Sequence, residues 1–92
     1  MAEMIEATMD VRLSFKRDKP HALYGKEVQM GFGAVDVLLL PESSPSEDYS
    51  EQDIIKMVRD EYPETLRVMD EAGWTVAKAE VLDYDVIGHD EY

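Results

Sequence analysis

The segment that most constrains the fold is a strict alternation of apolar and polar residues near the start of the chain. Polar residues fill the gaps from Glu6 to Lys16, and apolar residues take every second position: Ile5, Ala7, Met9, Val11, Leu13 and Phe15. Successive side chains of a strand point to opposite faces, so this period of two predicts a half-buried strand over residues 4–17. The apolar face of such a strand has to be covered by another layer of structure.

A second strand is expected over residues 26–40, with an interruption at Gly33. The apolar alternation changes phase at this glycine: Val28, Met30 and Phe32 precede it, and Val35, Val37 and Leu39 follow it. A slip of one residue sends all later side chains to the other face, so the change predicts a bulge or a bend. The residues after Gly33 count either as a continuation or as a strand of their own.

Residues 41–49 form an acidic connection rich in Pro and Ser, and a helix is expected over residues 50–72. Ser50 suits the N-cap, and Gly73 suits the C-terminal stop. The apolar residues fall on one arc of a helical wheel: Ile54, Ile55, Val58, Tyr62, Leu66, Met69 and Ala72. This stripe keeps its phase across Pro63, so the pattern favours one helix bent at the proline over two helices.

The last strand is expected over residues 75–87, with a second slip near Val81, before a frayed tail at 88–92. The order is therefore β-β-(β)-α-β. It predicts a single α+β domain over residues 1–92. Its small, mostly antiparallel sheet would have three to four strands, with one long Pro-bent helix packed on one face.

Charge and composition exclude several classes of function. The chain has 92 residues, a formal net charge of -12 and no cysteine. Without cysteine there is no disulfide scaffold, Cys-based zinc site or thiol nucleophile. The acidity argues against direct binding of nucleic acid or of an anionic membrane. No catalytic or cofactor motif stands out, and no signal peptide or membrane-spanning run is found. We therefore expect a cytoplasmic, non-enzymatic protein without a cofactor.

The acidity is concentrated in the second half of the chain. Residues 1–46 hold 7 acids and 5 bases, whereas residues 47–92 hold 14 acids and 4 bases. On the expected helix, four carboxylates form a row opposite the apolar stripe: Asp53, Asp60, Glu64 and Glu71. Helical rise would separate them by about 6 to 10 Å. Such a row can imitate DNA phosphates, with Glu47 and Asp48 extending it. The plainer interpretation is a solvated helix face, with Lys56 and Arg67 pairing along it.

Two other interpretations stay open. Five apolar residues fit poorly on a single covered sheet face, and they suggest a homodimer or assembly surface: Leu38, Leu40, Leu82, Tyr84 and Val86. Asp83 and Asp85 open a sequence that resembles a calcium loop. However, Ile87 stands where an EF-hand needs an oxygen ligand. A weak calcium-binding domain is therefore the third interpretation.

In size, in acidity confined to one half and in its lack of catalytic residues, the chain resembles small inhibitor proteins of phages and archaeal viruses. This likeness is one of type and depends on no shared motif. It implies an acidic protein in the host cytoplasm that docks on a basic, nucleic-acid-binding surface of another protein. The leading hypothesis is therefore a nucleic-acid mimic, and an assembly subunit is the alternative.

Overall fold

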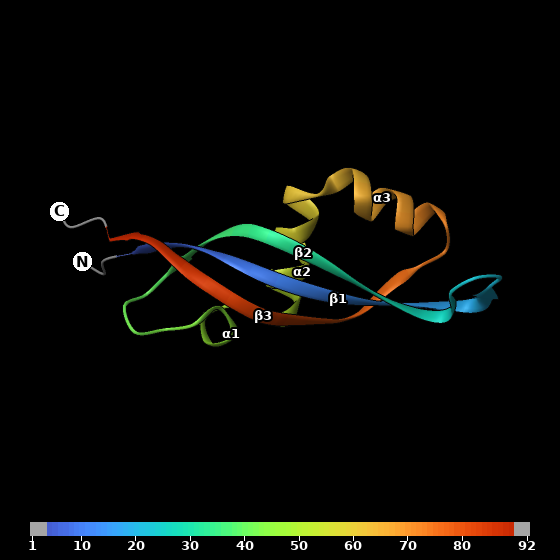
Figure 1. Ribbon diagram of the computed structural model, residues 1–92, viewed down its shortest axis with the longest axis horizontal. Coiled ribbons are helices and arrows are strands. Elements are labelled where there is room, and N and C mark those ends of the chain that lie inside the picture. The colour runs from blue at the N-terminus through green and yellow to red at the C-terminus, as the bar shows by residue number, and fades with distance from the viewer. Residues whose placement is uncertain (1–3, 90–92) are drawn as a thin grey trace.

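The computed structural model describes residues 4–89, which form a three-stranded antiparallel sheet with helices on one side (Figure 1). The strand order is β2-β1-β3, so β1 (Ile5–His21) is central, and β2 (Gly25–Leu39) and β3 (Thr75–His89) are the edges. The α+β class and the antiparallel sheet are confirmed. The first strand is longer than expected, because it runs on to His21 and turns directly into β2.

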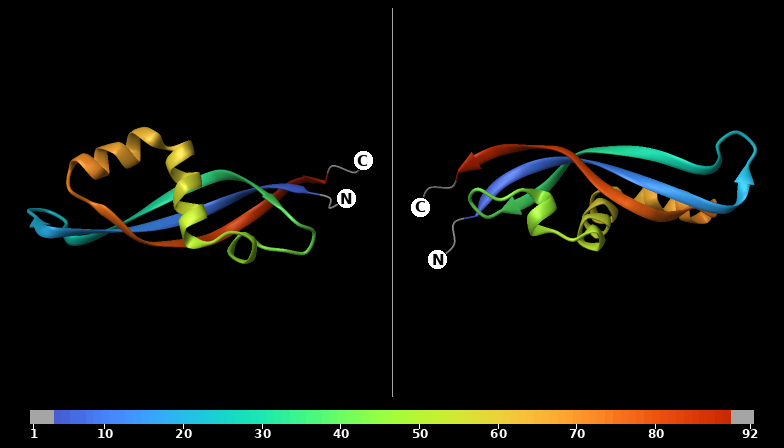
Figure 2. Two further views of the ribbon diagram at one scale, coloured as in Figure 1. Left: turned by 180° about the vertical axis from the view of Figure 1, so that it is seen from behind. Right: turned by 90° about the horizontal axis from the view of Figure 1, so that it is seen from below.

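The alternation along β1 separates the two faces of the sheet. All six of its apolar side chains are buried, and Met9, Val11 and Leu13 have no exposed surface at all. The helices cover this face: α2 passes in front of the strands in Figure 2 (left) and behind them in Figure 1. The opposite face carries the polar positions of β1 and is called the open face below. Core and solvent side therefore follow directly from the period of two.

The change of phase at Gly33 is a β-bulge, as expected. Met9 pairs with Val35 and Val11 with Phe32, so two residues of β2 lie opposite Asp10 alone. The second of them, Ala34, has a φ of 57°, and its N–H donates to Asp10 Oδ1 at 3.2 Å. β2 continues through this bulge as one strand. The fourth strand that the phase change left open is therefore not formed within residues 4–89.

β3 contains three bulges where the sequence predicted one near Val81. Against the register of β1, the extra residues are Ala77, Leu82 and Ile87, each five positions from the next. Each extra residue shifts the alternation of faces along β3 by one position, which keeps its apolar side chains on the helix side. Val81 and Ala79, for example, pair with the buried residues Val11 and Leu13. Bulges add twist and disrupt the regular ladder of an edge strand. They also discourage uncontrolled pairing of β3 with another strand.

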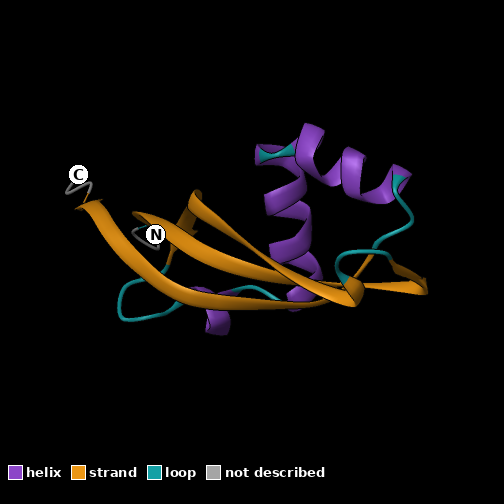
Figure 3. Cartoon of the chain, turned by 45° about the vertical axis from the view of Figure 1, so that its right-hand side comes forward, coloured by secondary structure: helices purple, strands orange, loops and turns teal. Residues whose placement is uncertain are grey.

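The expectation of one long bent helix is wrong. The segment forms α2 (Glu51–Glu61) and α3 (Pro63–Glu71), which run in different directions (Figure 3). Tyr62 lies between them with a φ of -126° and a ψ of 58°, outside the helical range. Proline lacks an N–H and fits the first position of a helix, so Pro63 starts α3 instead of bending α2. The apolar residues of both helices still face the sheet, since Val58 of α2 and Leu66 of α3 belong to the same core.

The connection expected as an acidic loop over residues 41–49 contains a further short helix, α1 (Pro45–Asp48). Ser44 precedes it in a capping box, and the Glu47 carboxylate accepts the Ser44 N–H. Pro45, its first residue, is buried. Of the tail expected to fray at 88–92, Gly88 and His89 belong to β3, whereas residues 90–92 lie outside the described residues.

Candidate interaction surfaces

Five carboxylates gather on one half of the open face. Residues opposite each other in antiparallel strands point to the same face, so the register places these side chains together. Thr8 of β1 lies between Asp36 of β2 and Asp85 of β3. We call the five carboxylates the open-face cluster: Glu6, Asp10, Asp36, Asp83 and Asp85. All five are exposed. Neither the helical wheel nor the net charge revealed this cluster, because its members come from three separate strands.

The basic side chains of the open face lie in its other half and are paired. Arg12 Nη2 lies 2.8 Å from Glu80 Oε2, and Lys78 Nζ lies 2.8 Å from Glu80 Oε1. These hydrogen bonds, first from Lys78 and then from Arg12, lower the pKa of Glu80 to about 2. Within residues 4–89, no Lys or Arg forms an ion pair with a member of the open-face cluster. The face is therefore acidic at one end and neutralised at the other.

The structure divides the acidic row expected along one helix. Asp53 and Asp60 lie on α2, and Glu64 and Glu71 lie on α3, so no common axis aligns them. All four are exposed. Asp53 belongs to a capping box in which it accepts the Ser50 N–H at 3.1 Å. Hydrogen bonds from the Ser50 N–H and hydroxyl lower its pKa.

Further acids of the predicted surface also stabilise the chain locally. Glu64 pairs with Arg67 within α3, and Glu47 belongs to the capping box of α1. Asp48 Oδ2 accepts the Leu40 N–H at 3.2 Å, which ties α1 to the end of β2. These acids therefore have local structural roles, as Asp10 and Asp83 also have through the N–H groups of Ala34 and Tyr84.

The five residues of the predicted dimer surface are exposed but do not share one face. Leu38 lies on the open face opposite Glu6. Tyr84 and Val86 pair with the buried residues Met9 and Ala7, so they point to the helix side. Leu82 occupies a bulge, and Leu40 follows the end of β2. A flat apolar sheet face is therefore not formed by these residues.

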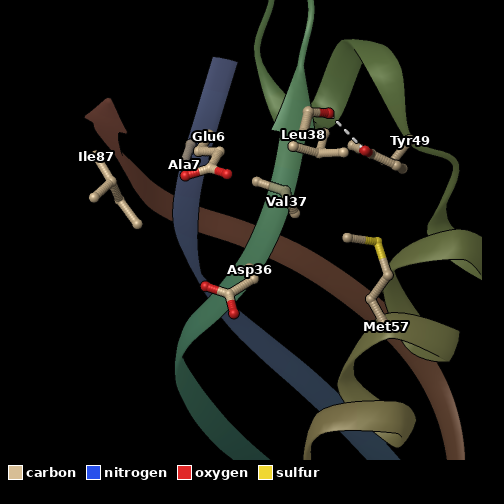
Figure 4. Close-up of a pocket in the computed structure, with 8 residues that line it drawn as sticks. All are labelled: Glu6, Ala7, Asp36, Val37, Leu38, Tyr49, Met57 and Ile87. Carbon is tan, nitrogen blue, oxygen red and sulfur yellow. Dashed lines mark hydrogen bonds between the residues drawn. The ribbon is translucent and has the colours of Figure 1, made fainter. Parts of the chain in front are cut away.

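A hollow of about 510 Å³ lies near the end of the sheet that holds the start of β1. Figure 4 shows Tyr49 and Met57 approaching it from the segment that holds α1 and α2. Glu6 and Asp36 border it from β1 and β2, but their carboxylates belong to the open-face cluster. The Tyr49 hydroxyl donates to the Leu38 carbonyl at 2.6 Å, which holds that wall in place. The remaining lining is apolar: Ala7, Val37, Leu38 and Ile87. We call this feature the end hollow.

Sequence reasoning missed the tip of the β1–β2 hairpin, which presents two large apolar side chains. Leu23 is 81% exposed and Tyr24 is 62% exposed. Pro20 and Gly25 predict only a loop between the first two strands. The signal that could have revealed it is the presence of Leu and Tyr where turns usually hold Gly, Asn, Asp or Ser.

The calcium candidates Asp83 and Asp85 lie on the open face as members of the open-face cluster. Within residues 4–89, no three His, Asp or Glu side chains are arranged to share a metal ion. In the same range, none of the helices has the length and apolar character that crossing a membrane requires. Comparison with protein-family models, with curated proteins and with solved structures finds no match for the chain.

Proposed function

We propose that this is a non-enzymatic docking protein whose open-face cluster binds a basic surface of a nucleic-acid-handling protein. The observation that carries the proposal is the direct register of Asp10 with Asp83, next to Asp36 and Asp85. Like charges directly opposite each other destabilise a sheet. Arrangements that destabilise a fold are expected mainly where they serve a function.

The sheet also gives the cluster a regular spacing. Neighbouring strands lie about 4.8 Å apart, and alternate residues on one face lie about 6.8 Å apart. Carboxylates at such steps can form charge-assisted hydrogen bonds with several Lys or Arg side chains at once. A protein surface that binds nucleic-acid phosphates presents such side chains. The helix row supports the same function less well, because it is split between α2 and α3.

The proposal is tested with two variants that remove the same charge from the two acidic surfaces. The cluster variant is Asp83→Asn with Asp85→Asn, and the row variant is Asp60→Asn with Glu71→Gln. Each variant and the unchanged protein are immobilised separately and exposed to a nuclease-treated lysate of the source cells. The proteins that bind are then challenged with duplex DNA as a competitor at constant ionic strength.

We expect the unchanged protein and the row variant to retain a nucleic-acid-binding protein that DNA releases. The cluster variant should lose it, because the carboxylates that replace phosphate are gone. Equal retention by the cluster variant, or release by salt but not by DNA, would contradict the proposal.

A further inference from the structure

The two edges of the sheet differ in how their outer backbone groups are satisfied. β3 carries three bulges, and the Ala79 N–H on its outer side donates to Glu51 Oε1 of α2 at 2.8 Å. In the second half of β2, the hydroxyls of Tyr49 and Tyr62 donate to two backbone carbonyls. Within residues 4–89, no element other than β1 forms a hydrogen bond with the backbone of residues 26–32. This stretch of edge is therefore uncapped.

The register shows which backbone groups of this stretch point outward. Successive residues of a strand direct their N–H and C=O groups to opposite sides. The Leu38 carbonyl accepts the Tyr49 hydroxyl, so Leu38 and its partner on β1, Glu6, form a pair without mutual hydrogen bonds. Every second residue of β1 from Glu6 to Lys16 has the same orientation. Their partners in the uncapped stretch, called the free edge, are exposed and point away from β1: Glu27, Gln29 and Gly31.

Apolar side chains border the free edge on the helix side. Val28 and Met30 alternate with its residues and pack against the core while staying partly exposed. A hollow of about 290 Å³ adjoins Met30, and α3 contributes Val68 and Met69 to its lining. Val68 is 58% exposed. An added strand would thus find unpaired backbone groups and apolar side chains together.

Gly31 has no evident purpose within a single copy. It does not adopt a positive φ, and a Cβ built at this position would meet no atom within 4 Å. Glycine weakens a strand and often marks a place where another backbone approaches closely. The glycine is therefore a second, independent indication that the free edge is a contact surface.

We propose that the free edge pairs with the free edge of a second copy, antiparallel about a two-fold axis at Gln29. Gln29 then lies opposite itself and Glu27 opposite Gly31, so the outward N–H and C=O groups of all three residues are paired. On the helix side, Val28 of each copy lies opposite Met30 of the other. No like charges meet, because Glu27 faces a glycine. The stretch is thus complementary to itself in side-chain type as well as in backbone.

The pairing closes on itself and gives a dimer. It joins two three-stranded sheets into one sheet whose outer edges are both the bulged β3. About seven residues of each β2 take part, fewer than the roughly 20–30 residues a side of a standard interface, so the dimer should be weak. The inference goes beyond the proposed function and can fail separately from it, since it needs no other protein and no member of the open-face cluster.

Disulfide cross-linking tests the two-fold axis directly, because the natural chain has no cysteine. In the proposed register the two Gln29 Cα atoms lie about 5.5 Å apart, within the range that a disulfide spans. The two Glu27 Cα atoms lie about 14 Å apart, which is too far. With diamide as the thiol oxidant, Gln29→Cys should form a covalent dimer at least tenfold faster than the control Glu27→Cys.

Sedimentation velocity of the full chain over a series of concentrations measures the association itself. The weight-average sedimentation coefficient should rise with concentration and level off at the dimer. Gln29→Pro removes an outward N–H, which an edge strand tolerates, and should keep the chain monomeric. Val86→Pro on the outer side of β3 is the matched control and should leave dimerisation unchanged. Circular dichroism checks that both variants stay folded.

Charge at Gly31 tests the predicted neighbour. Gly31→Glu places like charges opposite each other in both Glu27 pairs and should weaken the dimer about fivefold, whereas Gly31→Lys should strengthen it by a similar factor. The open space around Gly31 accommodates either side chain within one copy. Gln52→Glu on α2 adds the same charge as Gly31→Glu away from the edge and should have little effect.

Three results would overturn the inference. One is an unchanged chain that stays monomeric at every concentration. Another is cross-linking of Gln29→Cys that is no faster than that of Glu27→Cys. The third is a dimer that Gln29→Pro leaves as stable as in the unchanged chain, which would assign the contact to a different surface.

Discussion

Asp10 and Asp83 face each other across β1 and β3, and a double-mutant cycle measures their repulsion. Residues in direct register have Cβ atoms about 5 Å apart, so their carboxylates are separated by roughly 6 Å. Two unit charges at roughly 6 Å repel each other by about 0.7 kcal/mol in water. Asp→Asn is the suitable change, because the amide oxygen still accepts the N–H of Ala34 at Asp10 and that of Tyr84 at Asp83.

The coupling free energy between Asp10 and Asp83 is obtained from urea unfolding of four proteins: the unchanged chain, the two single variants and the double variant. Each single change should raise the free energy of unfolding, since either one removes the pair's repulsion. The double change should gain about 0.7 kcal/mol less than the sum of the two. The coupling should nearly vanish in 1 M NaCl, where the Debye length is about 3 Å.

A matched cycle between Asp10 and Asp60 serves as the control. Asp60 lies on α2, on the other side of the sheet, so its coupling to Asp10 should be close to zero. The reasoning is refuted if the Asp10–Asp83 coupling is no larger than that of the control cycle. It is also refuted if the coupling persists in 1 M NaCl, which would indicate a contact other than charge repulsion.

Two further predictions concern Glu80 and Ala34. Hydrogen bonds from Lys78 and Arg12 hold the pKa of Glu80 at about 2, against an ordinary 4.5. The ionised carboxylate therefore stabilises the fold above pH 4.5, and this contribution is lost as the pH falls towards 2. Its carboxyl ¹³C shift should therefore titrate near pH 2. Between pH 4.5 and pH 2, the Glu80→Gln variant should lose less stability than the unchanged chain, and equal losses would contradict the ion pairs. Ala34→Gly should raise the free energy of unfolding by about 0.5 kcal/mol in urea, because Ala is strained at a φ of 57°, whereas the control Ala79→Gly should lower it. A loss at both positions would show that Ala34 is not strained.

Local pattern accounts for the parts of the fold that were predicted correctly. The burial of β1 follows from its period of two, and the bulge beside Gly33 follows from the change of phase. The helical wheel could not show that Pro63 starts a new helix, because an apolar stripe in phase is compatible with both arrangements. Tyr62 decides the matter through its hydrogen bond to the Gly33 carbonyl at 2.5 Å and its ring contact with Phe32.

The candidate surfaces were predicted less completely for the same reason. The acidic row was a property of one helix, and the break at Tyr62 divides it. Asp83 and Asp85 were predicted as part of the acidic half and as weak calcium candidates, but the sequence does not reveal which β1 residues lie beside them. The register of β3, shifted by three bulges, brings them to Asp10 and Asp36.

The sequence by itself determined what depends on neighbours in the chain: the strands, the buried face of β1, the first bulge and the excess of negative charge. Only the tertiary structure decided where that charge gathers and which apolar residues remain exposed. Strand register brings together residues far apart in the chain, and each bulge shifts which side chains become neighbours. The net charge of -12 is therefore a property of the sequence, whereas the open-face cluster and the end hollow exist only in the fold.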